Sequence, residues 1–94
     1  LKIGETLSPI NYRSLSFTLN NIGNIYKSRK EYGKALGYYK RSLDLKLKIY
    51  PSNHPTIINT RVNIEKMYSE TGSEEQCAIY FERVVNIARQ NDAS

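Results

Sequence analysis

The chain has 94 residues, which suffices for one small domain with a limited hydrophobic core. It carries 14 basic and 9 acidic residues, a formal net charge of +5, and one cysteine, so an internal disulfide framework is excluded. No apolar run reaches the roughly 18 residues that a membrane-spanning helix needs, and no segment resembles a signal peptide. We therefore expect a cytoplasmic chain without a membrane span.

The chain begins with a pattern that recurs 42 residues later. Its first apolar residues match a later set near the end of a predicted helix: Leu1, Ile3, Leu7 and Pro9 align with Leu43, Leu45, Ile49 and Pro51. We therefore expect residues 1–8 to be the end of a preceding helix. This alignment and the absence of an initiator methionine predict that the chain is a fragment of a longer protein.

Two helices are predicted between residues 13 and 50, which we define as repeat 1. Apolar residues from Ser14 to Ser28 recur at spacings of three and four, the pattern of an amphipathic helix: Leu15, Leu19, Ile22, Ile25 and Tyr26. Residues 32–49 show the same pattern through Ala35, Leu36, Tyr39 and Leu43, while four basic residues take solvent-facing positions: Lys34, Lys40, Arg41 and Lys46. This pair is called the A helix and the B helix below.

A second pair of helices is predicted in repeat 2, residues 55–90. Proline at positions 51 and 55 separates it from repeat 1, and Asn53 or His54 is placed to cap the new A helix at residues 55–70. Gly72 is expected to adopt a positive φ in the following turn. The second B helix spans residues 74–89, and residues 91–94 form a frayed tail. No strand pattern is present, so the predicted fold class is all-α.

The two pairs of helices form a repeat with a period of 42 residues. Identical residues recur at that distance, including Asn11/Asn53, Thr18/Thr60, Asn21/Asn63, Ile22/Ile64, Tyr26/Tyr68, Tyr38/Tyr80 and Arg41/Arg83. A fixed period of this length is typical of an α-solenoid, in which each helical hairpin buries one face against its neighbours.

The hairpins resemble tetratricopeptide repeats, specifically the extended 42-residue variety of kinesin light chains and related scaffold proteins. The resemblance covers essentially the whole chain and rests on set positions: Leu19, Ile22, Gly23 and Tyr26 in the A helix, Ala35, Tyr39 and Leu43 in the B helix, and the linker 51–55. It implies a right-handed superhelix with further repeats in the parent chain. At Gly23 and Ala35, small residues would let the helices approach closely.

Repeat 2 departs from this pattern. Arg61, Glu65 and Cys77 stand at the positions of Leu19, Gly23 and Ala35, so we expect looser contact between its two helices. In repeat 1, Lys30 replaces the usual turn glycine.

The resemblance implies that the A helices line a concave groove that holds an extended peptide of a partner protein. The residues expected on that groove are Phe17, Asn20, Asn21 and Asn24 in repeat 1, Asn59, Asn63 and Lys66 in repeat 2, and Lys27 at its edge. An asparagine amide can both donate to and accept from a peptide backbone, and the lysines favour an acidic peptide. The alternative is that these residues are ordinary exposed helix positions, or that the asparagines bond to the neighbouring hairpin.

Other chemistry has little support in the sequence. His54 is better explained as a linker or cap residue, Cys77 as an inert core thiol, and Glu74 and Glu75 as helix N-terminal residues. No Cys/His cluster has metal-ligand spacing and no glycine-rich phosphate loop occurs. We expect no catalytic residue, cofactor or metal.

Two alternative functions remain open. Residues 27–48 contain eight basic and two acidic residues, so this hairpin is a candidate for binding nucleic acid or an anionic membrane, although a solvated helix exterior explains it as well. The chain is also a candidate regulatory or targeting segment of a larger multidomain enzyme. Protein or peptide binding is the leading hypothesis.

Overall fold

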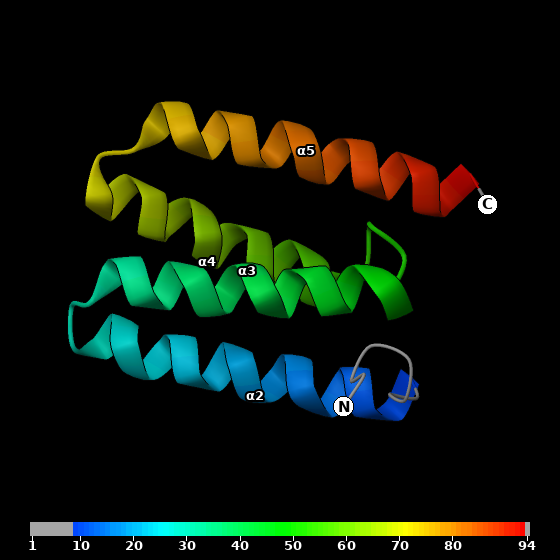
Figure 1. Ribbon diagram of the computed structural model, residues 1–94, viewed down its shortest axis with the longest axis horizontal. Coiled ribbons are helices and arrows are strands. Elements are labelled where there is room, and N and C mark those ends of the chain that lie inside the picture. The colour runs from blue at the N-terminus through cyan, green and yellow to red at the C-terminus, as the bar shows by residue number, and fades with distance from the viewer. Residues whose placement is uncertain (1–8, 94) are drawn as a thin grey trace, which may run out of the picture.

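The computed structural model describes the backbone of residues 9–93 and the side chains of residues 11–90. Within them the chain forms α2 (Pro9–Ser28), α3 (Tyr32–Ile49), α4 (Pro55–Thr71) and α5 (Glu74–Ala93), and no strand. Consecutive helices run in opposite directions, so that two antiparallel hairpins stack on each other (Figure 1). This arrangement confirms an all-α helical repeat fold of about two repeats, with α2 and α4 as the A helices.

Two of the helices are longer than the sequence pattern predicted. α2 begins at Pro9 instead of Ser14, because a proline is tolerated in the first turn of a helix and no helix-breaking residue separates the two positions. α5 continues beyond Arg89 to Ala93, so the helix includes residues 91–93 of the expected tail. The expected end of a preceding helix at residues 1–8, together with residue 94, lies outside the described residues.

The turns after both A helices use a residue with left-handed backbone geometry. Gly72 has φ 71°, as predicted, while Lys30 at the equivalent position has φ 62°. After Lys30, the backbone N–H of Glu31 donates to the carbonyl of Tyr26 at 2.9 Å, which closes the end of α2. Because a side chain is strained in this conformation, Lys30 carries a cost that Gly72 avoids.

The linker between the repeats caps α4 with a histidine. The backbone N–H of Thr56 donates to Nδ1 of His54 at 3.1 Å, and Pro55 occupies the first turn of the helix. The His54 ring also packs against Tyr50, with 4.4 Å between the ring centroids. Of the two cap candidates that the sequence offered, Asn53 and His54, the structure uses His54.

The first hairpin is closely packed around a glycine and a tyrosine. A Cβ atom added at Gly23 would lie 2.8 Å from the ring of Tyr39, and both Tyr39 and Ala35 are fully buried. Small residues at positions 23 and 35 therefore allow α2 and α3 to approach each other, as the sequence predicted.

The second hairpin is looser, which is also as predicted. α4 and α5 make far less contact with each other than α2 and α3 do. Glu65 is exposed at the position equivalent to Gly23, and the guanidinium of Arg61 lies 5.2 Å from the ring centroid of Phe81. A cation over an aromatic ring thus replaces the aliphatic contact of the first hairpin.

Lys46 is buried, contrary to its predicted solvent-facing position. Its side chain is 3% exposed, and its Nζ donates to Oγ1 of Thr60 on α4 at 2.8 Å. The sequence pattern of α3 alone contains no information on this partner, because Thr60 comes from the next repeat. Leu15 and Ile25, expected on the apolar side of α2, are exposed instead.

Candidate peptide-binding face

The predicted groove residues occupy one side of each A helix. We call this set the A-helix face: Phe17, Asn20, Asn21, Asn24 and Lys27 on α2, with Asn59, Asn63 and Lys66 on α4. Their spacings of one, three and four residues keep them on a common side of a helix with 3.6 residues per turn.

Asn21 and Asn63 stand at the same position in the two repeats. Asn21 is exposed on α2, and Asn63 is half-buried on α4. Each amide offers two N–H donors and one acceptor oxygen. Successive repeats therefore present the same hydrogen-bonding group from two helices of the same orientation.

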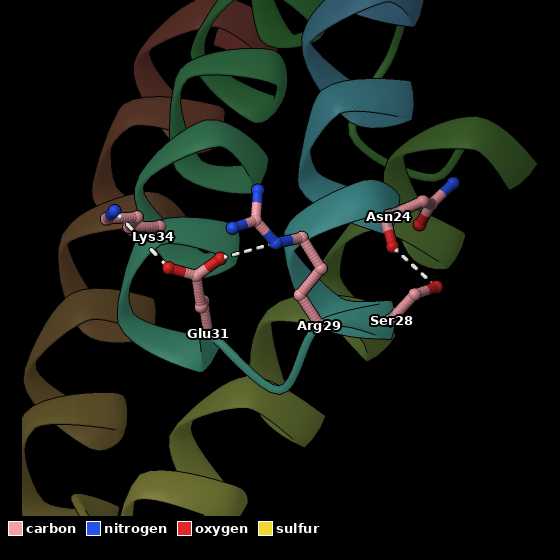
Figure 2. A network of polar contacts seen from close by, with 5 residues as sticks. All are labelled: Asn24, Ser28, Arg29, Glu31 and Lys34. Carbon is pink, nitrogen blue, oxygen red and sulfur yellow. Dashed lines mark hydrogen bonds and ion pairs between the residues drawn. The ribbon is translucent and has the colours of Figure 1, made fainter.

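Asn24 differs from its neighbours because the fold already uses its side-chain oxygen. The hydroxyl of Tyr39 donates to Asn24 Oδ1. The hydroxyl of Ser28 donates to the main-chain carbonyl of Asn24 at 3.0 Å (Figure 2). Burial raises the pKa of Tyr39, so its hydroxyl stays protonated and able to donate. The amide nitrogen of the Asn24 side chain remains for a ligand. No pattern in the sequence indicates the bond between Tyr39 and Asn24.

The remaining members of the face differ in exposure. Asn20 is half-buried, and its side-chain oxygen has no hydrogen-bond partner among the described residues. Asn59 is exposed, and Phe17 is 41% exposed with Nζ of Lys46 5.2 Å from its ring centroid. The face therefore combines polar amides with one accessible aromatic ring.

Lys27 and Lys66 border one hollow near the C-terminal ends of α2 and α4. Both line a hollow of about 400 Å³, together with Tyr32, Met67 and Glu70 among others. The hollow draws on α2, α3 and α4, so the predicted pair of lysines shares one site although 39 positions separate them in the sequence. The carboxylate of Glu70, which also lines the hollow, offsets part of the positive charge.

Comparison with known proteins identifies the fold. The family model described as tetratricopeptide repeat matches residues 14–90. The chain belongs to the tetratricopeptide repeat family. No curated protein and no solved structure matched the chain. Tetratricopeptide repeats generally mediate protein–protein interaction, and the family typically forms non-catalytic interaction modules.

Several basic residues of the first tetratricopeptide hairpin are engaged within the fold. The carboxylate of Glu31 forms ion pairs with Nε of Arg29 at 2.9 Å and with Nζ of Lys34 at 3.3 Å (Figure 2). Nζ of Lys40 lies 4.8 Å from the ring centroids of both Tyr68 and Tyr80, which links α3 to α4 and α5. With Lys46 buried as well, the positive charge of residues 27–48 is partly used in holding the repeats together.

The described residues of this repeat protein contain few side chains suited to metal or thiol chemistry. No group of three or more His, Cys, Asp or Glu side chains within it is placed to hold a metal ion. Cys77 is half-buried beside the core, and burial raises the pKa of its thiol, with Glu65 and Glu74 adding to the effect. No helix among the described residues is both long and apolar enough to cross a membrane.

Proposed function

We propose that the A-helix face binds an extended peptide segment of a partner protein. On this proposal the chain is a non-catalytic, cytoplasmic module of a scaffold related to kinesin light chains, with further repeats in its parent chain. The observation that carries it is the pair Asn21 and Asn63, which two consecutive A helices present at the same repeat position.

An extended peptide suits this pair for a geometric reason. A peptide backbone repeats its N–H and C=O groups along its length, and an asparagine amide can pair with both. Two amides repeated along a solenoid can therefore bind main-chain groups without requiring a particular side chain. The ligand loses conformational freedom on binding, so a face of two repeats should bind with modest affinity.

The lysines add a preference for acidic sequence. Lys27 and Lys66 line the same hollow, where a glutamate or aspartate of the peptide would form charge-assisted hydrogen bonds. Glu70 in that hollow reduces the net attraction without reversing it, because two cations face one carboxylate. We therefore expect acidic peptides to bind more tightly than neutral ones, and the difference to shrink with salt.

A peptide array tests the proposal. The probes are immobilised synthetic decapeptides, half with glutamates near the C-terminal end and half with glutamines at the same positions. The chain should bind the acidic set, and Asn21→Ala/Asn63→Ala should lose that binding while retaining its helical circular dichroism. Asn86→Ala, at an exposed position on α5 outside the face, is the matched control. Unchanged binding by the folded double variant would remove the assignment.

A further inference from the structure

Lys46 is a buried cation without a counter-ion among the described residues. Within them its ammonium makes one hydrogen bond, from Nζ to Oγ1 of Thr60 on α4 at 2.8 Å. A lysine ammonium has three N–H donors, so two of them find no acceptor in this part of the chain. Burial lowers the pKa of Lys46, and no carboxylate of a described residue raises it again. The interior of the repeat therefore holds a desolvated cation with unused hydrogen-bonding capacity.

The one partner of this ammonium is neutral. The hydroxyl of Thr60 donates its proton to the main-chain carbonyl of Thr56 at 2.9 Å, so it serves Lys46 as an acceptor only. A hydroxyl oxygen carries no charge that could offset the ammonium. A B helix does not need a lysine at this position, because Ala88 is the equivalent residue of repeat 2. The packing of the helices therefore gives no reason for a charge at position 46.

The ammonium lies beneath the A-helix face. Its Nζ is 5.2 Å from the ring centroid of Phe17 on α2, and its partner Thr60 lies between Asn59 and Asn63 in the sequence of α4. Thr60 is buried, whereas Phe17 is 41% exposed. Side chains that are partly exposed change rotamer rapidly. The route from the face to the buried ammonium therefore passes Phe17.

We propose that Lys46 binds an acidic side chain of the peptide on the A-helix face, with Phe17 as its movable cover. This inference rests on the proposed peptide-binding function. A glutamate that enters past Phe17 accepts from the unused N–H groups in a poorly solvated setting, where charge-assisted hydrogen bonds are stronger than at the surface. The site is separate from the hollow of Lys27 and Lys66 near the C-terminal ends of α2 and α4, because Phe17 and Thr60 lie in the N-terminal halves of these helices.

A matched pair of peptides measures the contribution of Lys46. Both are fluorescein-labelled synthetic decapeptides, one with glutamate and the other with glutamine at every second position, and fluorescence anisotropy gives a Kd for each. The chain used is Lys27→Met/Lys66→Met, which removes the two lysines of the face. It should still prefer the glutamate peptide by about fivefold. Adding Lys46→Met should bring this ratio close to one, whereas adding Lys48→Met, at an exposed position on the same helix, should leave it at about fivefold.

Substitution of Phe17 tests the cover. Phe17→Ala should weaken the binding of both peptides, because an aromatic contact is lost. It should also raise the preference for the glutamate peptide by about two- to threefold, because the ammonium becomes accessible. A side chain that only packs against the peptide would lower both affinities equally. Urea unfolding checks that each variant is folded, and Lys46→Met should be at least as stable as the unmodified chain.

The outcomes separate this inference from the function on which it rests. If neither peptide binds the unmodified chain, the A-helix face and the role of Lys46 both fail. If the glutamate peptide binds but its preference is the same with and without Lys46, this inference alone fails, and water satisfies the remaining donors of the ammonium. A preference that Phe17→Ala leaves unchanged would also overturn it, because Phe17 would then not cover the cation.

Discussion

The ring of Tyr39 fills the space in which a side chain at Gly23 would lie. An added Cβ atom would come within 2.8 Å of the ring, and the ring cannot easily move because Tyr39 is fully buried and its hydroxyl bonds to Asn24. This contact sets the distance between α2 and α3. It also explains why repeat 1 has a glycine in mid-helix, where glycine costs about 1 kcal/mol relative to alanine.

Gly23→Ala is therefore expected to destabilise the chain. The alanine gains about 1 kcal/mol in helix propensity but loses about 1–3 kcal/mol to overpacking against Tyr39, so a net loss of about 1 kcal/mol is expected. Urea unfolding followed by circular dichroism measures it. Gly37→Ala is the control, because nothing lies within 4 Å of that position, and it should stabilise by about 0.5–1 kcal/mol. Equal stabilisation by both changes would contradict the packing account.

Lys30→Gly is expected to stabilise the first hairpin. Lys30 has φ 62°, and a side chain in left-handed geometry costs about 1 kcal/mol that glycine does not pay. Gly72→Ala, at the equivalent turn with φ 71°, should lose a similar amount. Thermal unfolding should thus move in opposite directions for the two variants. Shifts of the same sign would show that backbone strain does not control these turns.

Lys46→Met should raise the free energy of unfolding at neutral pH by about 1 kcal/mol. The reason is that an apolar side chain of similar length replaces a buried charge. Burial lowers the pKa of Lys46 below the ordinary value of 10.5, so the unfolded chain binds its proton more tightly than the folded chain does. The stability of the unmodified chain therefore rises as pH increases from the folded pKa toward 10.5.

The advantage of Lys46→Met should consequently shrink as pH rises through that window. Urea unfolding at a series of pH values measures the difference between the two chains. Lys48→Met, an exposed position on the same helix, should change stability by less than about 0.5 kcal/mol at any pH. A difference for Lys46→Met that is independent of pH would mean that Lys46 holds its proton equally well in both states.

Cys77 should react slowly with a disulfide reagent such as Ellman's reagent. Burial raises the pKa of its thiol, and the carboxylates of Glu65 and Glu74 raise it further, so less thiolate is present at neutral pH than in the unfolded chain. Glu65→Gln should speed the reaction about two- to threefold, and this increase should be smaller at high salt because salt screens the carboxylate. Glu82→Gln, an exposed position further along α5, should leave the rate unchanged. Equal rates in folded and urea-unfolded chains would contradict the prediction that the fold reduces the thiolate fraction of Cys77.

The sequence predicted features that depend on one hairpin at a time. The four helices, the cap at His54, the positive φ of Gly72 and the contact of Gly23 with the return helix all follow from local spacing and turn chemistry. The looser second hairpin followed from Glu65 and Arg61 in the same way.

Features that depend on which side chains pack against each other across helices were not predictable, either within repeat 1 or between the repeats. The sequence pattern of α3 predicts that Lys46 faces solvent. The structure buries it because Thr60 of the next repeat accepts a hydrogen bond from its Nζ. The apolar pattern of α2 predicts that Ile25 is a core residue, but its side chain is 58% exposed among the described residues. The bond between Tyr39 and Asn24 depends on the relative rotation of α2 and α3, which periodicity does not specify. Contact with a peptide remains a prediction for every residue of the A-helix face.

The central claim is that the A-helix face binds an extended acidic peptide. Its most direct test is a titration of ¹⁵N-labelled chain with a glutamate-rich decapeptide, followed by amide and side-chain NMR shifts. We predict that the side-chain amides of Asn21 and Asn63 shift together, with the backbone amides of Lys27 and Lys66, while Asn86 on α5 does not move. Shifts confined to α5, or absent from both Asn21 and Asn63 at saturation, would contradict the account.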